Sequence, residues 1–174
     1  LKYFEPIKEQ LTVRYDTIAS FTKQTITELR DTIWAMNSGQ VTWDSLMLRI
    51  QDYVQKARES KSSMHFDCEV AENLDSHSLL ASSDSIQVLR IVQEAVQNAV
   101  KYSEASQVQI KFHATKKDLV ATIHDNGKGF DPQKVDRTSS LGMLIMENLT
   151  EQLEGEIAIQ SNSHGTLYHL TFTH

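Results

Sequence analysis

Apolar side chains in the first part of the chain recur in alternating steps of three and four residues from Tyr15 to Met36. This period predicts a long helix that packs its apolar stripe on other helices. Residues 8–36 contain no proline or glycine that would interrupt it. The helix should end at Asn37-Ser38-Gly39, because glycine and asparagine favour the backbone conformation that closes a helix.

The pattern changes near residue 41. Thr42 is a suitable N-cap for a second helix. Beyond that helix, short segments that alternate apolar and polar residues predict strands near 108–112, 157–159 and 168–172. Residues 84–102 and 141–153 have the apolar faces of helices. The sequence therefore predicts residues 41–174 as an α+β domain, a two-layer α/β sandwich in which helices cover one face of a mixed sheet.

The composition of the 174 residues is that of a soluble globular protein, with 40% hydrophobic and 23% charged side chains. No apolar run approaches the roughly 18 residues that a membrane helix needs. The net charge of −6 opposes a broad nucleic-acid surface, but it leaves a nucleotide ligand open because one pocket can be locally positive.

The single cysteine forms no internal disulfide and fits a reducing compartment. The chain opens without a signal peptide or an initiator methionine, which suggests an excised fragment.

Three polar residues share one stripe of the helix expected at 84–102. Glu94, Asn98 and Lys101 stand at positions i, i+4 and i+7. Such a stripe suits a magnesium phosphate: an amide oxygen binds a hard cation, a carboxylate orients a group or accepts a proton, and an ammonium offsets phosphate charge. The alternative is a solvated helix face with a glutamate–lysine pair.

A second candidate site follows the segment 119–125, which has the pattern of a strand. Asp125 shares the parity of the apolar residues, so its carboxylate should point to the buried side. A buried carboxylate needs a donor, and the amino group of adenine is one. Gly127 and Gly129 follow at once and permit a turn with close approach of a ligand. An ordinary hairpin turn of the Asp-Asn-Gly type is the alternative.

Residues 131–140 are polar and have no apolar period, which predicts a loop before a helix that begins near Leu141. Gly142 in the first turn of this helix would leave backbone N–H groups open to a phosphate, which the helix dipole also favours. A glycine at this position is equally compatible with ordinary helix entry.

Several stretches resemble the motifs of two-component sensor histidine kinases. RIVQEAVQNAVKYS at 90–103 resembles their asparagine box, DNGKGFD at 125–131 their first glycine box and LGM at 141–143 their second. Gly165-Thr166 before the last strand resembles the closing motif of the family. The boxes occur in the family's order and spacing, and the resemblance covers about residues 41–174. It implies the Bergerat fold, the histidine kinase-type ATPase fold that gyrase-type and mismatch-repair ATPases share.

The resemblance implies a pocket for ATP and Mg²⁺ and assigns residues to it. Glu94 and Lys101 would take part in catalysis. Asn98 would hold the magnesium ion, with Glu94 as a second candidate ligand, and Asp125 would bind adenine. The residues expected to bind ATP are Asn98, Lys101, Tyr102, Asp125, Gly127, Gly129, Leu141, Gly142, Met143 and Thr166.

Residues 26–37 resemble the second helix of the dimerisation and phosphoacceptor hairpin in the nitrate-sensor-like subfamily. Residues 1–40 are therefore expected to hold this helix and the tail of the first. None of the seven histidines lies in this region. The phosphoacceptor is thus expected upstream of Leu1, and this chain is expected to bind ATP without phosphorylating itself.

The resemblance also implies the partners and the location of the full protein. They are ATP, the phosphoacceptor helix of the parent kinase, the receiver domain of a response regulator and a second copy of the kinase in a homodimer, with no nucleic acid. This part of the kinase is expected in the cytoplasm, where ATP is available.

One motif departs from the family pattern. Ser139 and Ser140 stand where many members carry another glycine in the second box, and this change concerns the contacts to phosphate made by the lid, the loop before the helix that begins near Leu141.

Two other functions are compatible with the motifs. One is an ATP-hydrolysing switch of the same fold, in which Glu94 activates water. The other is a pseudokinase dimerisation module that binds no nucleotide.

Overall fold

The computed structural model describes residues 15, 18, 19, 22, 25–27, 29–34, 39–75, 77–131 and 141–173. The chain separates into two units, Leu1–Gly39 and Gln40–His174. The expected tail of a first helix, the Asn37-Ser38 helix end and most of the expected loop 131–140 lie outside the described residues. No helix within the described ranges is both long and apolar enough to span a bilayer.

The described residues of the first unit between Tyr15 and Trp34 are helical, in agreement with the period of apolar positions. The hydroxyl of Thr22 donates a hydrogen bond of 2.8 Å to the carbonyl oxygen of Ile18, one turn earlier. Five large apolar side chains of this segment are exposed, namely Tyr15, Ile18, Ile26, Leu29 and Ile33, whereas Trp34 is half-buried. The assignment of residues 1–40 to a dimerisation hairpin stays a prediction.

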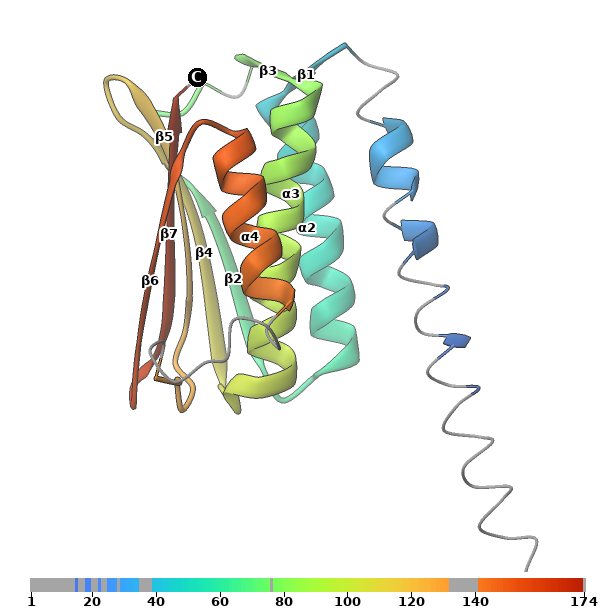
Figure 1. Ribbon diagram of the computed structural model, residues 1–174, viewed down its shortest axis with the longest axis vertical. Coiled ribbons are helices and arrows are strands. Elements are labelled where there is room, and N and C mark those ends of the chain that lie inside the picture. The colour runs from blue at the N-terminus through green and yellow to red at the C-terminus, as the bar shows by residue number, and fades with distance from the viewer. Residues whose placement is uncertain are drawn as a thin grey trace, which may run out of the picture. The chain divides into compact units, whose positions relative to one another are not determined.

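The second unit is built on a five-stranded sheet with the strand order β2-β4-β5-β7-β6 (Figure 1). β2 (His65–Val70) runs parallel to β4 (Gln107–Ala114), and the other neighbouring strands are antiparallel. The remaining strands are β5 (Asp118–Asp125), β6 (Glu156–Asn162) and β7 (Gly165–Thr173). The sheet is therefore mixed, as the sequence predicts.

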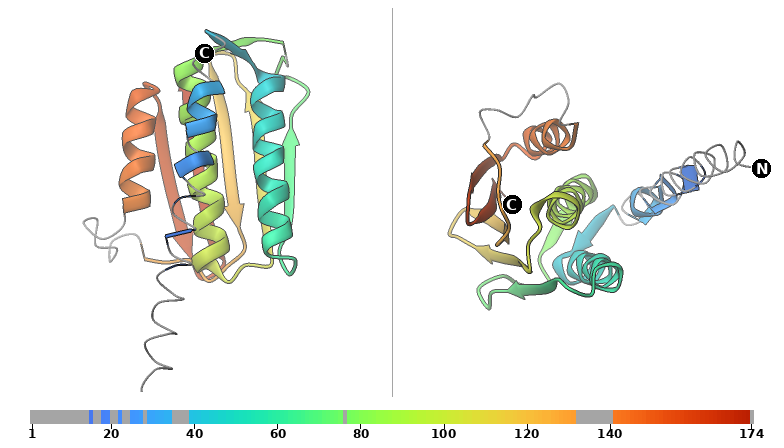
Figure 2. Two further views of the ribbon diagram at one scale, coloured as in Figure 1. Left: turned by 90° about the vertical axis from the view of Figure 1, so that its right-hand side faces the viewer. Right: turned by 90° about the horizontal axis from the view of Figure 1, so that it is seen from below.

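Three helices lie side by side on one face of this sheet (Figures 1 and 2). They are α2 (Trp43–Ser60), α3 (Ser82–Asn98) and α4 (Leu141–Gln152). Thr42 caps α2 as expected, because its hydroxyl oxygen accepts a hydrogen bond of 3.3 Å from the backbone N–H of Ser45. The predicted two-layer α+β architecture is confirmed.

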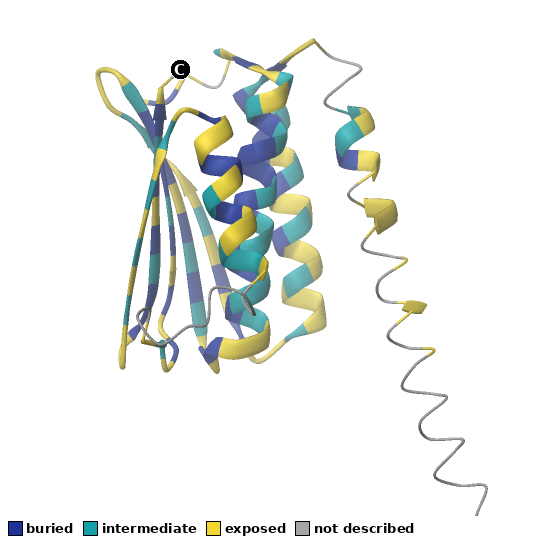
Figure 3. Ribbon diagram, in the orientation of Figure 1, coloured by how far each residue is buried: buried dark blue, intermediate teal, exposed yellow. Residues whose placement is uncertain are grey.

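The core lies between the helices and the sheet (Figure 3). Alternate strand residues face it, namely Phe66, Val108, Ile110, Phe112, Leu119, Ala121, Ile123, Tyr168, Leu170 and Phe172. From α3 the buried apolar residues are Val88, Leu89, Ile91, Val92, Ala95 and Val96. Each large apolar side chain removed from water stabilises the fold by about 1.5–3 kcal/mol, so the inward face of each element is strongly specified.

Two features of the fold were not expected from the sequence. β1 (Gln40–Thr42) pairs with β3 (Leu79–Ala81) in a separate antiparallel sheet. In addition, the helix expected at 84–102 changes character near its end, where Ala99–Ser103 form a π-helical turn. A π turn widens the helix locally and is frequent at functional sites.

Candidate functional site

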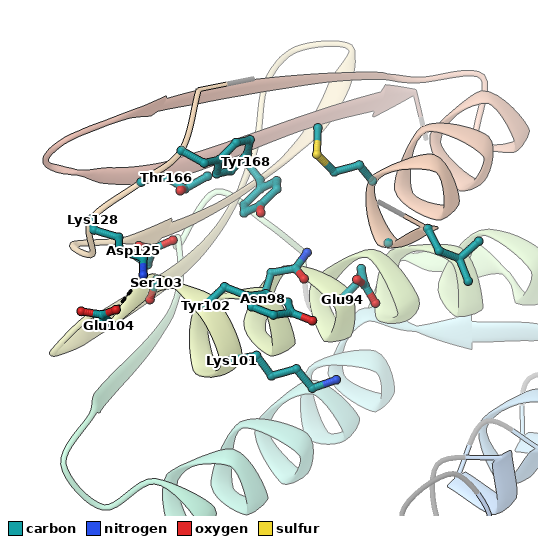
Figure 4. Close-up of a pocket in the computed structure, with 15 residues that line it drawn as sticks. Glu94, Asn98, Lys101, Tyr102, Ser103, Glu104, Asp125, Lys128, Thr166 and Tyr168 are labelled. Carbon is teal, nitrogen blue, oxygen red and sulfur yellow. Dashed lines mark hydrogen bonds and ion pairs between the residues drawn. The ribbon is translucent and has the colours of Figure 1, made fainter. Parts of the chain in front are cut away.

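A cavity of about 610 Å³ lies between the end of α3, the end of β5, the beginning of β7 and the first turn of α4 (Figure 4). The lining residues that the sequence assigned to the site are Glu94, Asn98, Lys101, Tyr102, Asp125, Gly129, Leu141, Gly142, Met143 and Thr166. Five lining residues were not expected from the sequence: Ser103, Glu104, Lys128, Phe130 and Tyr168. The cavity thus gathers residues that lie far apart along the chain.

Asp125 forms one end of the cavity. It is the last residue of β5 and only 4% exposed, because it continues the alternation of buried residues in that strand. One carboxylate oxygen accepts a hydrogen bond of 2.9 Å from the backbone N–H of Gly127. Thr166 lies opposite Asp125 on β7 and is also buried. A buried carboxylate with acceptor capacity left over favours a ligand that donates hydrogen bonds.

The loop after β5 is held by hydrogen bonds to the start of β4 and to the end of the π turn. The side-chain oxygen of Asn126 accepts from the backbone N–H groups of Ser106 and Gln107, at 2.9 Å each. The backbone N–H of Lys128 donates to the carbonyl oxygen of Ser103 at 2.8 Å. The next element that the structure describes along the chain is α4, and the antiparallel neighbours of β5 are β4 and β7, so the described residues show no hairpin partner directly after this loop.

The two glycines of this loop have different surroundings. A Cβ at Gly127 would overlap the carbonyl oxygen of Ser103, and Gly127 is not among the residues that line the cavity. Gly129 does line the cavity, with φ +60°, and a Cβ there would overlap the carbonyl oxygen of Asn162. The next backbone N–H, that of Phe130, donates to the Ser161 hydroxyl at 2.9 Å. Gly127 therefore permits the turn, whereas Gly129 faces the ligand space.

The polar stripe of α3 is altered by the π turn. Glu94 and Asn98 are half-buried in α3 and line the cavity, but Lys101 and Tyr102 lie in the π turn and are exposed. In Figure 4 the Lys101 side chain runs below Asn98 and Glu94, on the side away from Tyr168. The expectation of one straight stripe of three residues is therefore met for the first two, and Lys101 stands at the rim.

Tyr168 forms the middle of the cavity wall. Burial raises its pKa to about 12, and the nearby carboxylates of Asp125 and Glu94 act in the same direction, whereas the neighbouring Asn98 amide lowers this pKa. Tyr168 was missed in the sequence because it shares the alternation of Leu170 and the other core residues of β7. The alternation of apolar positions in β7 does not distinguish a tyrosine that lines the cavity from a phenylalanine of the core.

Glu94 meets the first turn of α4 at the other end of the cavity. A Cβ at Gly142 would overlap a carboxylate oxygen of Glu94. Tyr53 of α2 lies nearby and donates a hydrogen bond of 3.1 Å to the carbonyl oxygen of Gln93. Burial raises the pKa of Tyr53 to about 12, with a further contribution from Glu94. The reduced part of the second glycine box lies outside the described residues.

An exposed ion pair stands at the Asp125 end of the cavity. The ammonium of Lys128 lies 2.6 Å from a carboxylate oxygen of Glu104, and both residues line the cavity. The hydrogen bond from Lys128 lowers the pKa of Glu104. Because the two residues are 24 positions apart, no helical or strand period could have paired them.

Residues 83–174 match the sequence profile of a family described as histidine kinase-, DNA gyrase B- and HSP90-like ATPases. The chain belongs to this ATPase family. The matched segment contains every residue that the sequence assigned to the site. The ATPase domain is of the sensor histidine kinase type, and it is the ATP-binding catalytic region of such a kinase.

One relative in sequence is the signal transduction histidine-protein kinase/phosphatase DegS of Bacillus subtilis, with 36% identity over 116 residues. The alignment covers 66% of this chain and 29% of DegS. The histidine kinase domain of a blue-light activated kinase from Erythrobacter litoralis has a similar fold, with a TM-score of 0.69, 15% identity and coverage of 85% of this chain and 72% of that one. The mycobacterial sensor histidine kinase MprB also has a similar fold, with a TM-score of 0.61 and 19% identity. That comparison covers 77% of this chain and 95% of the MprB chain. The nitrate-sensor-like subfamily stays a prediction.

Proposed function

We propose that this domain binds ATP with Mg²⁺ in the cavity described above and presents the γ-phosphate to a histidine of a phosphoacceptor helix. The observation that carries the proposal is that the two ends of one cavity suit two different parts of a nucleotide. A buried carboxylate at one end, Asp125, suits a base with an amino group. At the other end, Glu94 lies against the N-terminal turn of α4, whose N–H groups suit phosphates, and Asn98 lines the same cavity.

The adenine would bind at Asp125 and Thr166. Asp125 keeps one oxygen in the turn through Gly127, which leaves the second oxygen for an exocyclic amino group. The hydroxyl of Thr166 lies 3.0 Å from the hydroxyl of Ser161, so its position is fixed by β6. The cavity of about 610 Å³ is within the range of ordinary small-molecule and cofactor sites.

Asn98 is the residue best suited to hold Mg²⁺, because its amide oxygen is a hard ligand and it lines the cavity. Among the described residues, no cluster of three or more His, Cys, Asp or Glu side chains could hold a metal. This fits magnesium, which usually takes only one or two protein oxygens and completes its shell with phosphate oxygens and water. When bound, the ion neutralises phosphate charge. Glu94 remains a second candidate ligand.

The catalytic contribution of the protein would be positioning and charge stabilisation. Glu94 would orient the attacking group or accept its proton, since it lies beside the turn that begins α4. Lys101 at the rim would offset phosphate charge. Tyr102, which is 66% exposed, would cover the nucleotide from the open side. Leu141, Gly142 and Met143 would contribute the backbone N–H groups and apolar surface of the α4 turn.

The wider context of the proposal concerns the full kinase. Residues 1–40 would form the second helix of the dimerisation and phosphoacceptor hairpin, and the parent protein would act as a homodimer in the cytoplasm. It would pass the phosphoryl group to an aspartate of a response regulator receiver domain. None of the seven histidines lies in residues 1–40, so this chain should bind ATP without labelling itself when incubated with γ-labelled ATP.

Isothermal titration calorimetry with ADP and with a non-hydrolysable ATP analogue, each with and without Mg²⁺, tests the proposal. We expect magnesium-dependent binding that Asn98→Ala weakens and that Gln97→Ala leaves unchanged; Gln97 is the matched control because it is also half-buried in α3 but does not line the cavity. Absence of any heat or thermal shift would favour a nucleotide-free signalling module. Steady release of phosphate from ATP would favour a hydrolysing switch.

A further inference from the structure

The π turn Ala99–Ser103 and the residue that follows it form one continuous part of the cavity wall. The consecutive residues that line the cavity here are Lys101, Tyr102, Ser103 and Glu104 (Figure 4). Ser103 is buried, whereas the other three are exposed at the rim. The position of this one short turn therefore decides where four of the lining side chains begin.

The carbonyl oxygens of the π turn take hydrogen bonds from donors that are not part of the helix backbone ladder. The last carbonyl groups of a helix have no partner within the ladder, and they need donors from elsewhere. The hydroxyl of Ser103 donates to the carbonyl oxygen of Ala99 at 2.6 Å. The carbonyl oxygen of Ser103 accepts from the backbone N–H of Lys128 at 2.8 Å. The carbonyl oxygen of Val100 accepts from the ammonium of Lys61 at 2.6 Å, across 39 positions of the chain.

Lys61 is anchored through its backbone as well as through its ammonium. It is the C-cap residue of α2, and its backbone N–H donates to the carbonyl oxygen of Ala57 at 3.1 Å. Its own carbonyl oxygen accepts from the backbone N–H of Met64 at 3.0 Å. A positive charge beside the last carbonyl groups of a helix is also favoured by the helix dipole. The end of α2 is thus tied to the turn that follows α3 by a half-buried side chain with a fixed origin.

Another lysine of α2 has a different kind of partner. Lys56 pairs with Asp52 of the same helix, and both side chains are 65% exposed. An exposed pair within one helix contributes little to stability and fixes no other element. Lys61, in contrast, bonds to a backbone atom of the segment that lines the cavity. The contact of Lys61 is therefore suited to set the position of that segment.

We propose that Lys61 is a positioning residue for nucleotide binding, which holds the π turn so that residues 101–104 keep their places in the cavity wall. The proposal rests on the proposed function of the cavity. Lys61 itself is not among the residues that line the cavity, so it acts through the turn and not by contact with the ligand. Without its ammonium the Val100 carbonyl loses this donor, and the turn can shift together with Lys101 and Tyr102.

Amide hydrogen exchange on the 174-residue chain without nucleotide tests the hold on the turn. Lys61→Met keeps the length of the side chain but removes the donor. It should speed exchange at residues 99–103 several-fold and leave the middle of α3 unchanged, because only the turn loses a contact. Lys56→Met is the matched control and should leave exchange in the turn as it is. Unchanged exchange in Lys61→Met, or the same increase in Lys56→Met, would overturn the inference.

Titration calorimetry with the Mg²⁺ complex of a non-hydrolysable ATP analogue tests the consequence for binding. Lys61→Met should weaken the affinity about fivefold, the value of one ordinary hydrogen bond, and Lys56→Met should not. Lys61→Arg keeps a charged donor on a long stem and should retain most of the affinity. An arginine variant that binds as weakly as the methionine variant, or full affinity in Lys61→Met, would contradict the positioning role.

A double-mutant cycle separates positioning from a long-range effect of the lysine charge on an anionic ligand. In a Lys101→Ala/Tyr102→Ala background, Lys61→Met should lose most of its effect on affinity, since the side chains that it positions are gone. A loss of the same size in that background would show that Lys61 acts by its charge alone and would overturn the inference. If the unaltered chain binds no nucleotide, the proposed function fails, and faster exchange in Lys61→Met would then show a structural role only.

Discussion

The carboxylate of Glu94 occupies the space in which a side chain at Gly142 would have to lie. The two residues come from α3 and from the first turn of α4, 48 positions apart in the chain. Gly142 has no positive φ, so it is required here by the neighbouring carboxylate and not by its own backbone conformation. The absence of a Cβ allows the acidic group and the N-terminal turn of α4 to share one end of the cavity.

Gly142→Ala should therefore disturb function more than stability. The end of the Glu94 side chain is flexible and can move away from the new methyl group, and alanine is a better helix residue than glycine. We expect an unchanged or slightly higher melting temperature but a several-fold weaker affinity for the Mg²⁺ complex of a non-hydrolysable ATP analogue. The same substitution in a Glu94→Ala background should have little effect, and a full loss there would contradict this explanation.

Asp125→Asn should reduce nucleotide affinity by at least about tenfold, because a charged acceptor for the adenine amino group is lost. Asparagine keeps one oxygen atom that can accept from the Gly127 N–H, so the turn should survive. Titration calorimetry and a thermal melt measure the two effects. Asp118→Asn at the opposite end of β5 is the control and should bind nucleotide normally. Similar affinities for both variants would remove Asp125 from the adenine site.

The sequence predicted much of this site because its signals are local. The alternation of β5 placed Asp125 on the buried side, and the glycines that follow the strand indicated close approach of a ligand. These two predictions depend on neighbours within a few residues, where strand periods and turn residues are informative. The link between α3 and α4 came instead from the family order of the boxes.

Other parts of the site depend on contacts that periods do not encode. Lys128 and Glu104 meet across 24 positions, and Tyr168 has the pattern of an ordinary core residue. The π turn was not predicted, because Ala99–Ser103 has the composition of a normal helix end and no period of apolar residues marks the widened turn. The same turn moved Lys101 from the expected stripe to the rim.

Gly129→Ala should lower the free energy of unfolding more than Gly39→Ala. Both have φ near +60°, which costs an alanine about 1 kcal/mol in either place. At Gly39 nothing lies within 4 Å of an added Cβ, whereas at Gly129 the Cβ would overlap the carbonyl oxygen of Asn162. Urea denaturation should show a free energy of unfolding lower by about 1 kcal/mol for Gly39→Ala and by more than about 2 kcal/mol for Gly129→Ala. Equal losses would show that only the backbone conformation matters.

Stability should fall at high pH because of two tyrosines. Burial raises the pKa of both Tyr53 and Tyr168 to about 12, from the ordinary value of 10.0. Between these values the unfolded chain loses the phenol protons while the folded chain keeps them, so folding is progressively disfavoured as pH rises. Each tyrosine contributes at most about 1.4 kcal/mol per pH unit. Below pH 10 the contribution should be complete and constant.

The measurement is the urea midpoint from pH 8 to pH 11.5 for the unaltered chain and for Tyr53→Phe/Tyr168→Phe. The double variant should lose part of the decline above pH 10, because the other titrating groups are common to both proteins. Parallel curves for the two proteins would show that these phenols are not protected from ionisation in the folded state.

A crystal structure of this chain with Mg²⁺ and a non-hydrolysable ATP analogue would test nucleotide binding in this cavity. We expect the adenine amino group within hydrogen-bonding distance of the Asp125 carboxylate and the ion on the side-chain oxygen of Asn98. The phosphates should lie at the first turn of α4. A nucleotide bound elsewhere, or bound in this cavity with its base away from Asp125, would show that the proposed site is wrong.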